Sequence, residues 1–180
     1  MSYSSSLIKL NESFLNNYIP SILIRDTGII NLNCEFQMKS KEGRIYIGIG
    51  AIIENTMTGK ILLLRRSGKV EFAKNIWDDV GGRMRPFETP EETLRREVYE
   101  ETGITELEII KPIDVSNYYR GERTAENQMI VITYWCKTAS LNVKLSAEHD
   151  QYKWLSPEEA LALINDFSLK NNVKKFIQEK

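Results

Sequence analysis

Apolar and polar positions along the chain follow two different periods, and these periods divide it into predicted strands and helices. Residues 45–53 form an apolar run typical of a strand, 55–59 reads as a turn, and 60–66 returns as the partner strand of a hairpin. Further strands are predicted at 106–117, 127–137 and 152–155. Between them lie helical patterns, so the sequence predicts an α/β (α+β) domain with helices packed on a mixed sheet.

The best-marked helix is predicted over 89–102. Thr89 suits the N-cap, Pro90 suits the first helical turn, and Glu92 completes a capping box with Thr89. Gly103 follows the last apolar position and is expected to end the helix. A second Ser-Pro-Glu-Glu signature predicts a helix from 156 to about 165, and a final helix is predicted at 168–178.

The first 43 residues are predicted to be a separate N-terminal arm, ahead of a domain covering 44–180. Within this arm, 6–18 suits a short helix and 22–38 suits one or two strands. No chemical motif is evident there. The arm could be a lid or a dimerisation element, which would make the protein a homodimer, and the sequence does not choose between these roles.

Composition narrows the class of partner. With 24 basic and 25 acidic residues the net charge is -1, so no basic field exists to hold nucleic acid, and a small molecule is the expected partner. Cys34 and Cys136 are far apart and lack the spacing of a zinc site. The N-terminus does not resemble a signal peptide, and the most apolar run is too short to span a membrane. A cytoplasmic protein without membrane association is therefore expected.

Three glutamates of the predicted 89–102 helix carry the candidate chemistry. Glu97, Glu100 and Glu101 are spaced i, i+3 and i+4, which places them on one helix face. Their mutual repulsion is unfavourable unless a cation lies among them, and oxygen ligands of this kind select magnesium or manganese. A solvated acidic helix face is the alternative explanation of the same spacing.

The surroundings of these glutamates favour the metal-binding interpretation. Glu88 stands where a carboxylate stabilises a helix start, and it could pair with Arg96 and so fix the preceding loop on the helix. Gly81 and Gly82 precede this loop, and a backbone without side chains can approach an ion or a phosphate closely.

Together these residues resemble the signature of the Nudix family, to which MutT belongs. Gly82, five residues, Glu88, seven residues and the run from Arg96 to Ile104 match the complete Nudix box, G-x5-E-x7-R-E-U-x-E-E-x-G-U with U apolar. The resemblance implies an α/β/α sandwich around a mixed sheet, with the box as a loop–helix–loop. It also implies a magnesium site, which manganese could share, formed by Glu97, Glu100, Glu101, the carbonyl of Gly81 and Glu148 from a later loop.

What the resemblance implies for function is magnesium-dependent hydrolysis of a phosphoanhydride bond. The substrate would be a nucleoside triphosphate or a nucleoside diphosphate linked to another group. Catalysis would depend on Glu97, Glu101 and Glu148, and the sequence leaves open whether Glu97 or Glu148 accepts the proton of the attacking water. The alternatives are a nucleotide-sensing module without turnover and an isoprenoid diphosphate isomerase, which usually needs a cysteine near the box.

Substrate contacts are harder to assign from sequence. Arg66 and Arg83 flank the box and could hold phosphates, and Tyr119 could stack on a base. His149, the only histidine, is expected to be a solvated loop residue. The identity of the group beyond the phosphates should depend on the loops at 66–77 and 117–127 and on the N-terminal arm.

Overall fold

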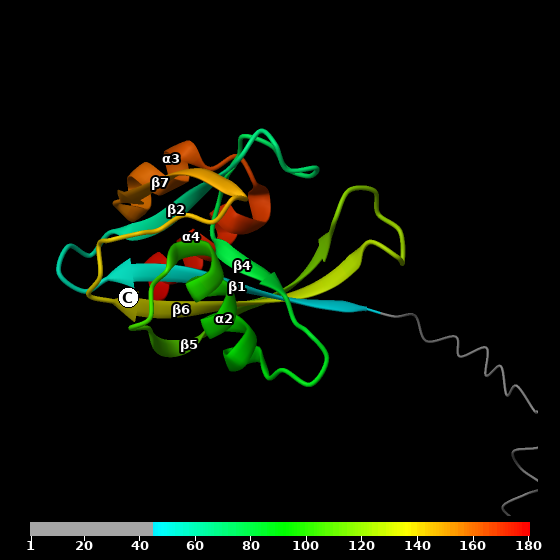
Figure 1. The fold of residues 1–180 in the computed structure, drawn as a ribbon, viewed down its shortest axis with the longest axis horizontal. Helices are drawn as coiled ribbons and strands as arrows, with labels where there is room; N and C mark the ends of the chain where they lie inside the picture. Colours follow the sequence, from blue (N-terminus) through cyan, green and yellow to red (C-terminus); the bar gives the residue numbers. More distant parts are fainter. Residues whose placement is uncertain (1–44) are drawn as a thin grey trace, which may run out of the picture. The chain divides into compact units, whose positions relative to one another are not determined.

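The computed structural model describes residues 45–180, drawn in colour in Figure 1. The predicted arm, with its helix and strands, lies outside the described residues. Its role and the division of the chain at residue 43 therefore stay predictions.

Residues 45–180 form a seven-stranded mixed sheet and three helices. The strands are β1 (Tyr46–Asn55), β2 (Ile61–Arg66), β3 (Trp77–Asp78), β4 (Val80–Arg83), β5 (Glu108–Tyr119), β6 (Gln128–Thr138) and β7 (His149–Leu155). The helices are α2 (Pro90–Thr102), α3 (Pro157–Leu163) and α4 (Phe167–Glu179).

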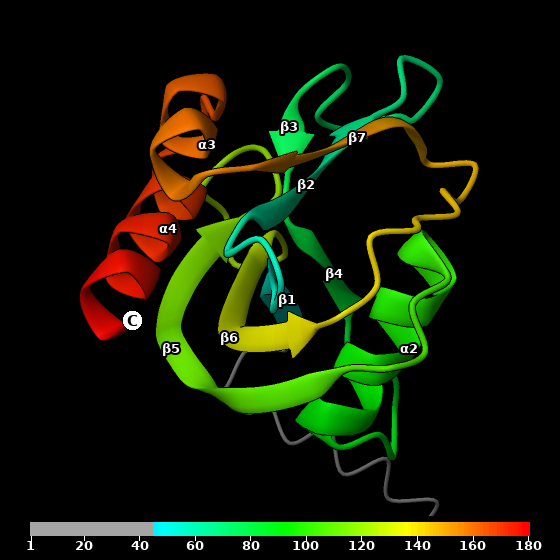
Figure 2. The same ribbon diagram turned by 90° about the vertical axis from the view of Figure 1, so that its left-hand side faces the viewer.

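The sheet is covered on both faces, with α2 on one side and α3 and α4 on the other (Figure 2). Alternation along the central strands explains this layering, because successive side chains of a strand point to opposite faces. Ile49 and Ile53 of β1 belong to the core that includes Leu94 of α2, whereas Ile52 belongs to the core that includes Phe176 of α4. The predicted α/β/α sandwich is confirmed.

Strand β1 divides its pairing between two neighbours along one edge. Its first half pairs antiparallel with β4, from Gly48 opposite Arg83 to Ala51 opposite Val80, and its far end pairs with β2. Along the other edge it pairs with β6 in parallel. Since β4 leads directly into the loop before α2, this arrangement holds the double glycine against the centre of the sheet.

The caps of α2 agree with the sequence prediction. Thr89 accepts a hydrogen bond from the backbone of Glu92, the Glu92 carboxylate accepts one from the backbone N–H of Thr89, and Gly103 ends the helix with φ of 69°. The two short strands β3 and β4 were not predicted from the sequence. Within residues 45–180, none of the helices is long and apolar enough to cross a bilayer.

Candidate active site

A cavity of about 420 Å³ opens between the second half of α2, the middle of the sheet and the start of α4. Residues from the predicted site and residues that no motif had indicated line it together. Those from the predicted site are Arg66, Gly81, Gly82, Arg83, Glu97, Glu101 and Glu148. The others include Phe72, Asp78, Asp79, Tyr118, Arg120, Thr133, Asp166 and Asn172.

Both glycines of β4 are required by close contacts. A Cβ on Gly81 would lie 2.3 Å from the carbonyl oxygen of Ile49, inside the β1–β4 pairing. A Cβ on Gly82 would lie 2.3 Å from the carboxylate carbon of Glu97. The absence of side chains here lets the helix bring its carboxylate directly against the strand.

Glu101 is the most deeply buried carboxylate of α2. Its Oε2 accepts a hydrogen bond of 3.1 Å from the backbone N–H of Gly81. Burial, opposed by that hydrogen bond and reinforced by the negative charges of Glu97, Asp78 and Glu148, raises the pKa of Glu101 to about 8. The raised pKa reflects the cost of ionising Glu101 in a buried place beside other carboxylates, and a bound cation would lower that cost.

Arg96 forms ion pairs with three glutamates of the Nudix box. Its guanidinium donates to both carboxylate oxygens of Glu88, at 2.7 and 2.9 Å, and this pairing lowers the pKa of Glu88 to about 2. The predicted Glu88–Arg96 pair is therefore confirmed. The same guanidinium contacts Glu97 at 2.6 Å and Glu100 at 3.2 Å.

Glu148 reaches the cavity because its loop is bound to the helix and to the sheet. The backbone N–H of Ser146 donates to the carbonyl of Glu101 at 3.2 Å, and Ser67 at the end of β2 donates its N–H to the carbonyl of Glu148 at 2.8 Å. The carboxylate of Glu148 lies 3.7 Å from a terminal nitrogen of Arg66. A residue far from the box in sequence thus lines the same cavity as Glu97 and Glu101.

Not all of the predicted metal ligands come together. Glu97, Glu101 and Glu148 line the cavity, but Glu100 does not, and its half-exposed carboxylate pairs with Arg85 and Arg96. Across residues 45–180, no three carboxylates, histidines or cysteines converge as in a preformed metal site. The donor chemistry of the three lining carboxylates fits a hard divalent cation. The contact of Glu97 with Arg96 uses its Oε1.

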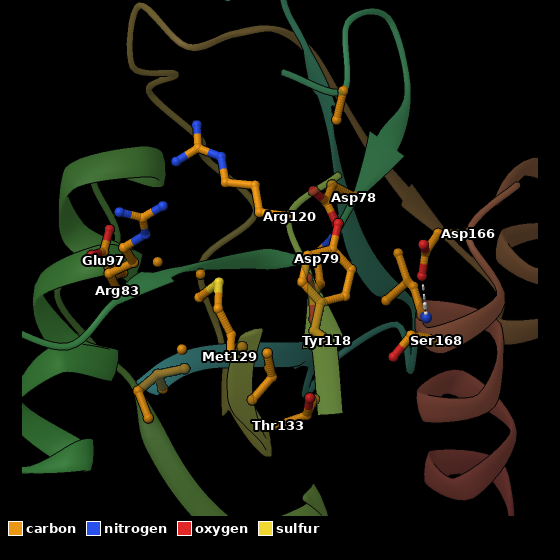
Figure 3. A pocket seen from close by; sticks show the side chains of 18 of the residues that line it. Asp78, Asp79, Arg83, Glu97, Tyr118, Arg120, Met129, Thr133, Asp166 and Ser168 are labelled. Atoms are coloured by element: carbon orange, nitrogen blue, oxygen red, sulfur yellow. Dashed lines mark hydrogen bonds between the residues drawn. The ribbon is translucent and has the colours of Figure 1, made fainter. Parts of the chain in front are cut away.

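Of the predicted substrate contacts, the two arginines line the cavity and the tyrosine does not. Arg83 points into it from β4, with its guanidinium 4.7 Å from the ring centre of Tyr46 (Figure 3). Tyr118 lines the cavity instead of Tyr119, whose ring lies 5.4 Å from the guanidinium of Arg123. Neighbouring residues of a strand face opposite sides, so only one of this pair can point inward.

Sequence reasoning missed the polar residues that line the cavity but lie outside the Nudix box. Asp78 and Asp79 lie directly before Val80 and the double glycine, and this nearness to the box was the available signal. Burial raises the pKa of Asp78, and burial together with the charge of Asp78 raises the pKa of Asp79 well above its usual range. Asp166 and Asn172 come from α4, and no spacing in the sequence links that helix to the box.

The expectation that His149 is a solvated loop residue was wrong. His149 is only 6% exposed at the start of β7, and burial and the charge of Arg66 lower its pKa to about 4. Cys136 is fully buried in the core, where burial raises the pKa of its thiol to about 12. A thiol in that environment is unreactive.

Comparison with known proteins agrees with this geometry. Nucleoside triphosphatase NudI of Escherichia coli is 37% identical over 90 residues, which are 46% of this chain and 63% of that protein, so the chain spans less than two thirds of such relatives. The MutT protein of Methanosarcina mazei matches with 32% identity and a TM-score of 0.66, covering 78% of this chain and 98% of that one.

An Ap4A hydrolase of C. elegans has the same fold, with 24% identity, a TM-score of 0.62 and coverage of 74% of this chain and 96% of that one. The NUDIX domain family model matches residues 45–179. A complete box on a matching sandwich, together with these matches, shows that the chain belongs to the NUDIX domain family.

Proposed function

We propose that the protein is a magnesium-dependent pyrophosphohydrolase. Its substrate would be a nucleoside triphosphate or a nucleoside diphosphate joined to another group. The single observation that carries this proposal is that Glu97, Glu101 and Glu148 line one cavity with Arg66 and Arg83. Carboxylates for a divalent cation and guanidinium groups for phosphates are the two requirements of phosphoanhydride hydrolysis.

The family relationship supports the same proposal. NudI is named a nucleoside triphosphatase, and the C. elegans neighbour is named an Ap4A hydrolase. Both names describe hydrolysis of compounds in which phosphates are linked to nucleosides.

The cavity groups contributed by α2, β4 and the Glu148 loop each have a role in this mechanism. Glu97, Glu101, Glu148 and the carbonyl of Gly81 would hold magnesium, with Glu100 joining after its release from the arginines. When bound, the metal supplies charge neutralisation at the phosphates and polarises a water molecule. Either Glu97 or Glu148 accepts the proton of the attacking water.

Arginines orient the polyphosphate. Arg83 projects from β4 beside the double glycine, and Arg66 projects from the end of β2 beside Glu148. Bidentate hydrogen bonds from a guanidinium to a phosphate fix both position and orientation. The bond broken lies between two phosphoryl groups, so one phosphate leaves while the other receives the oxygen of water.

The decisive experiment is a panel of nucleoside triphosphates and diphosphate-linked nucleotides with magnesium, assayed for released phosphate or diphosphate. Glu101→Gln is expected to reduce kcat/KM on the best substrate by about 100-fold or more. The amide oxygen of glutamine can still accept the Gly81 hydrogen bond, so the fold should persist. Glu91→Gln, an exposed position on the same helix, serves as the matched control and should retain activity.

Two outcomes would contradict the proposal. Undiminished activity of Glu101→Gln would show that catalysis does not depend on the carboxylate cluster. No turnover of any compound in the panel, with nucleotide binding still measurable, would favour a sensing module in place of an enzyme.

A further inference from the structure

Besides the carboxylates and arginines used in the proposed hydrolysis, a second set of polar side chains lines the cavity, and we call the part that they line its inner end. This inner end consists of Asp78, Asp79, Tyr118, Thr133, Asp166 and Asn172. In Figure 3 the side chains of Asp78, Asp79 and Tyr118 lie between the Arg83–Glu97 side and the Asp166–Ser168 side. None of these residues belongs to the box, and the hydrolytic mechanism above uses none of them.

At the inner end, the side chain of Asn172 has a hydrogen-bond acceptor that no donor of the described residues satisfies. It is only 4% exposed, and its amide nitrogen donates to the hydroxyl of Thr133 at 3.0 Å. Its Oδ1 has no hydrogen-bond partner among residues 45–180. A buried acceptor without a donor is unfavourable, and a bound group with N–H donors would satisfy it.

The two adjacent aspartates are held in place without a cation. Asp78 accepts the backbone N–H of Asp79 at 3.1 Å. A Cβ on Gly50 would lie 2.9 Å from Oδ2 of Asp79, so this carboxylate packs directly against the bare backbone of β1. Neither aspartate forms an ion pair with any lysine or arginine in the described part of the chain.

Asp166 already has a structural role, so it contributes less to recognition. Its Oδ1 accepts the backbone N–H of Leu169 at 2.8 Å as the N-cap of α4, which is the dashed line in Figure 3. The side chains of Asp78 and Asp79 also hydrogen-bond to each other. The acceptors left for a ligand are therefore the remaining oxygens of these two side chains and the amide oxygen of Asn172. Tyr118 adds an aromatic ring on which a flat heterocycle can stack.

A site that contains only hydrogen-bond acceptors favours heterocycles that present adjacent N–H donors. A 2-amino-4-oxopyrimidine ring, as in guanine and in pterins, presents a ring N–H beside an exocyclic amine, which are two adjacent donors for one carboxylate. Adenine and cytosine place their amine beside a ring acceptor. Hypoxanthine and uracil offer a ring N–H without the adjacent amine.

We propose that the inner end binds the heterocycle of the substrate and selects a 2-amino-4-oxopyrimidine ring through Asp78 and Asp79, with Asn172 as a further acceptor. This inference rests on the proposed function, because the phosphates of the same molecule would occupy the Arg83–Glu97 side. A site built to receive two donors rejects an analogue lacking one, since its own acceptors are then left unpaired.

Guanosine and inosine substrates differ by the 2-amino group alone, so they provide the test. Each is assayed as the triphosphate and as a 5′-diphosphosugar, with a dihydropterin triphosphate to decide between the two sources of the ring. The wild type is expected to prefer guanosine over inosine in kcat/KM by roughly 10-fold to 100-fold. Asp78→Asn and Asp79→Asn should reduce this preference by about tenfold, mainly through the guanosine compound.

Asp114→Asn is the matched control, because Asp114 pairs with Lys175 outside this cavity and its loss should leave the guanosine preference intact. Thermal unfolding of each variant verifies that it is folded. Calorimetric binding of α,β-methylene GTP and the corresponding ITP analogue tests the inner end without turnover.

Failure of the proposed function and failure of this inference give different results. If no substrate is hydrolysed but the guanosine analogue still binds more tightly than the inosine analogue, the proposed hydrolysis is rejected and the proposed ring selection is retained. Equal rates and equal binding of the guanosine and inosine compounds would overturn ring selection and leave hydrolysis standing. A preference that persists unchanged in both aspartate variants would also overturn it.

Discussion

Gly81 and Gly82 are adjacent in β4 but face different neighbours. The first lies against backbone of the paired strand, and the second lies against a side chain of α2. A backbone atom within a sheet cannot move without breaking strand pairing, whereas a glutamate side chain can rotate. The same substitution at the two positions should therefore affect different properties.

Gly81→Ala is expected to destabilise the fold by about 1–3 kcal/mol, because the added methyl overpacks the β1–β4 pairing. Gly82→Ala should cost less stability but displace Glu97, and kcat/KM should fall by about tenfold or more. Urea denaturation and steady-state kinetics of both variants measure the two effects. If Gly82→Ala kept full activity, Glu97 would not need its place beside the strand.

The box loop and α2 behave as one element because Glu88 joins them. Its carboxylate accepts from Arg96 on the helix, from the hydroxyl of Thr93, and from the backbone N–H of Arg85 in the loop. Charged hydrogen bonds of this kind stabilise the ionised carboxylate, which explains the lowered pKa of Glu88. Acid should therefore loosen the loop from the helix.

The lowered pKa of Glu88 makes the stability of the folded protein depend on pH. The pKa of Glu88 is about 2 in the folded protein and near the usual 4.5 in the unfolded chain, so its contribution to stability is complete above pH 4.5 and is lost as the pH falls towards 2. Glu88→Gln should lower stability at neutral pH and flatten the acid side of the stability curve between pH 4.5 and 2. Urea midpoints measured from pH 7 to pH 2 test this.

Glu91→Gln is the control for that experiment, since Glu91 lies in the first turn of α2 and forms no ion pair within residues 45–180. Its acid profile should follow the wild type. Identical profiles for Glu88→Gln and the wild type would mean that the Glu88–Arg96 pair does not hold the loop.

Elements with local signals were predictable from sequence, and those without them were not. The capping box at Thr89 and the left-handed Gly103 depend on neighbouring residues, so they defined α2 correctly. Strands β3 and β4 are too short for a hydrophobic period and contain two glycines, so their pairing depends on the rest of the sheet. Tyr118 and Tyr119 show the same limit, because strand register decides which one faces the cavity.

At the scale of the whole domain, one sheet supports two cores. Leu94 is fully buried on the α2 face, and Phe176 is fully buried on the α4 face, where its ring packs edge-on against Trp135 at 5.4 Å. Because β1 and β2 contribute side chains to both faces, neither core can be lost without disturbing the other. Residues 45–180 should therefore unfold as one cooperative unit.

Leu94→Ala is expected to destabilise this unit by about 2–5 kcal/mol and Phe176→Ala by about 3–5 kcal/mol. In both variants tryptophan fluorescence and far-UV circular dichroism should report a single coincident urea transition with an unchanged m-value. Separate transitions in Phe176→Ala would show that the α4 side is an independent folding unit.

The assembly of the cavity could be predicted only in part from sequence. The box placed Glu97 and Glu101 together because helix spacing alone determines their relation. Glu148 was inferred from the family resemblance and lines the same cavity. Asp166 and Asn172 are brought in by the packing of α4 on the opposite face of the sheet, and the sequence contains no local sign of that contact.

The N-cap of α4 couples the stability of this helix to the occupancy of the cavity. Asp166 both caps this helix and lines the cavity, and Asn172, six residues further along, donates a hydrogen bond to Thr133. A ligand that occupies the cavity would oppose local opening of α4 from its first turn. Amide hydrogens of this C-terminal helix should then exchange with solvent deuterium more slowly when ligand is present, so exchange there would report occupancy from outside the box.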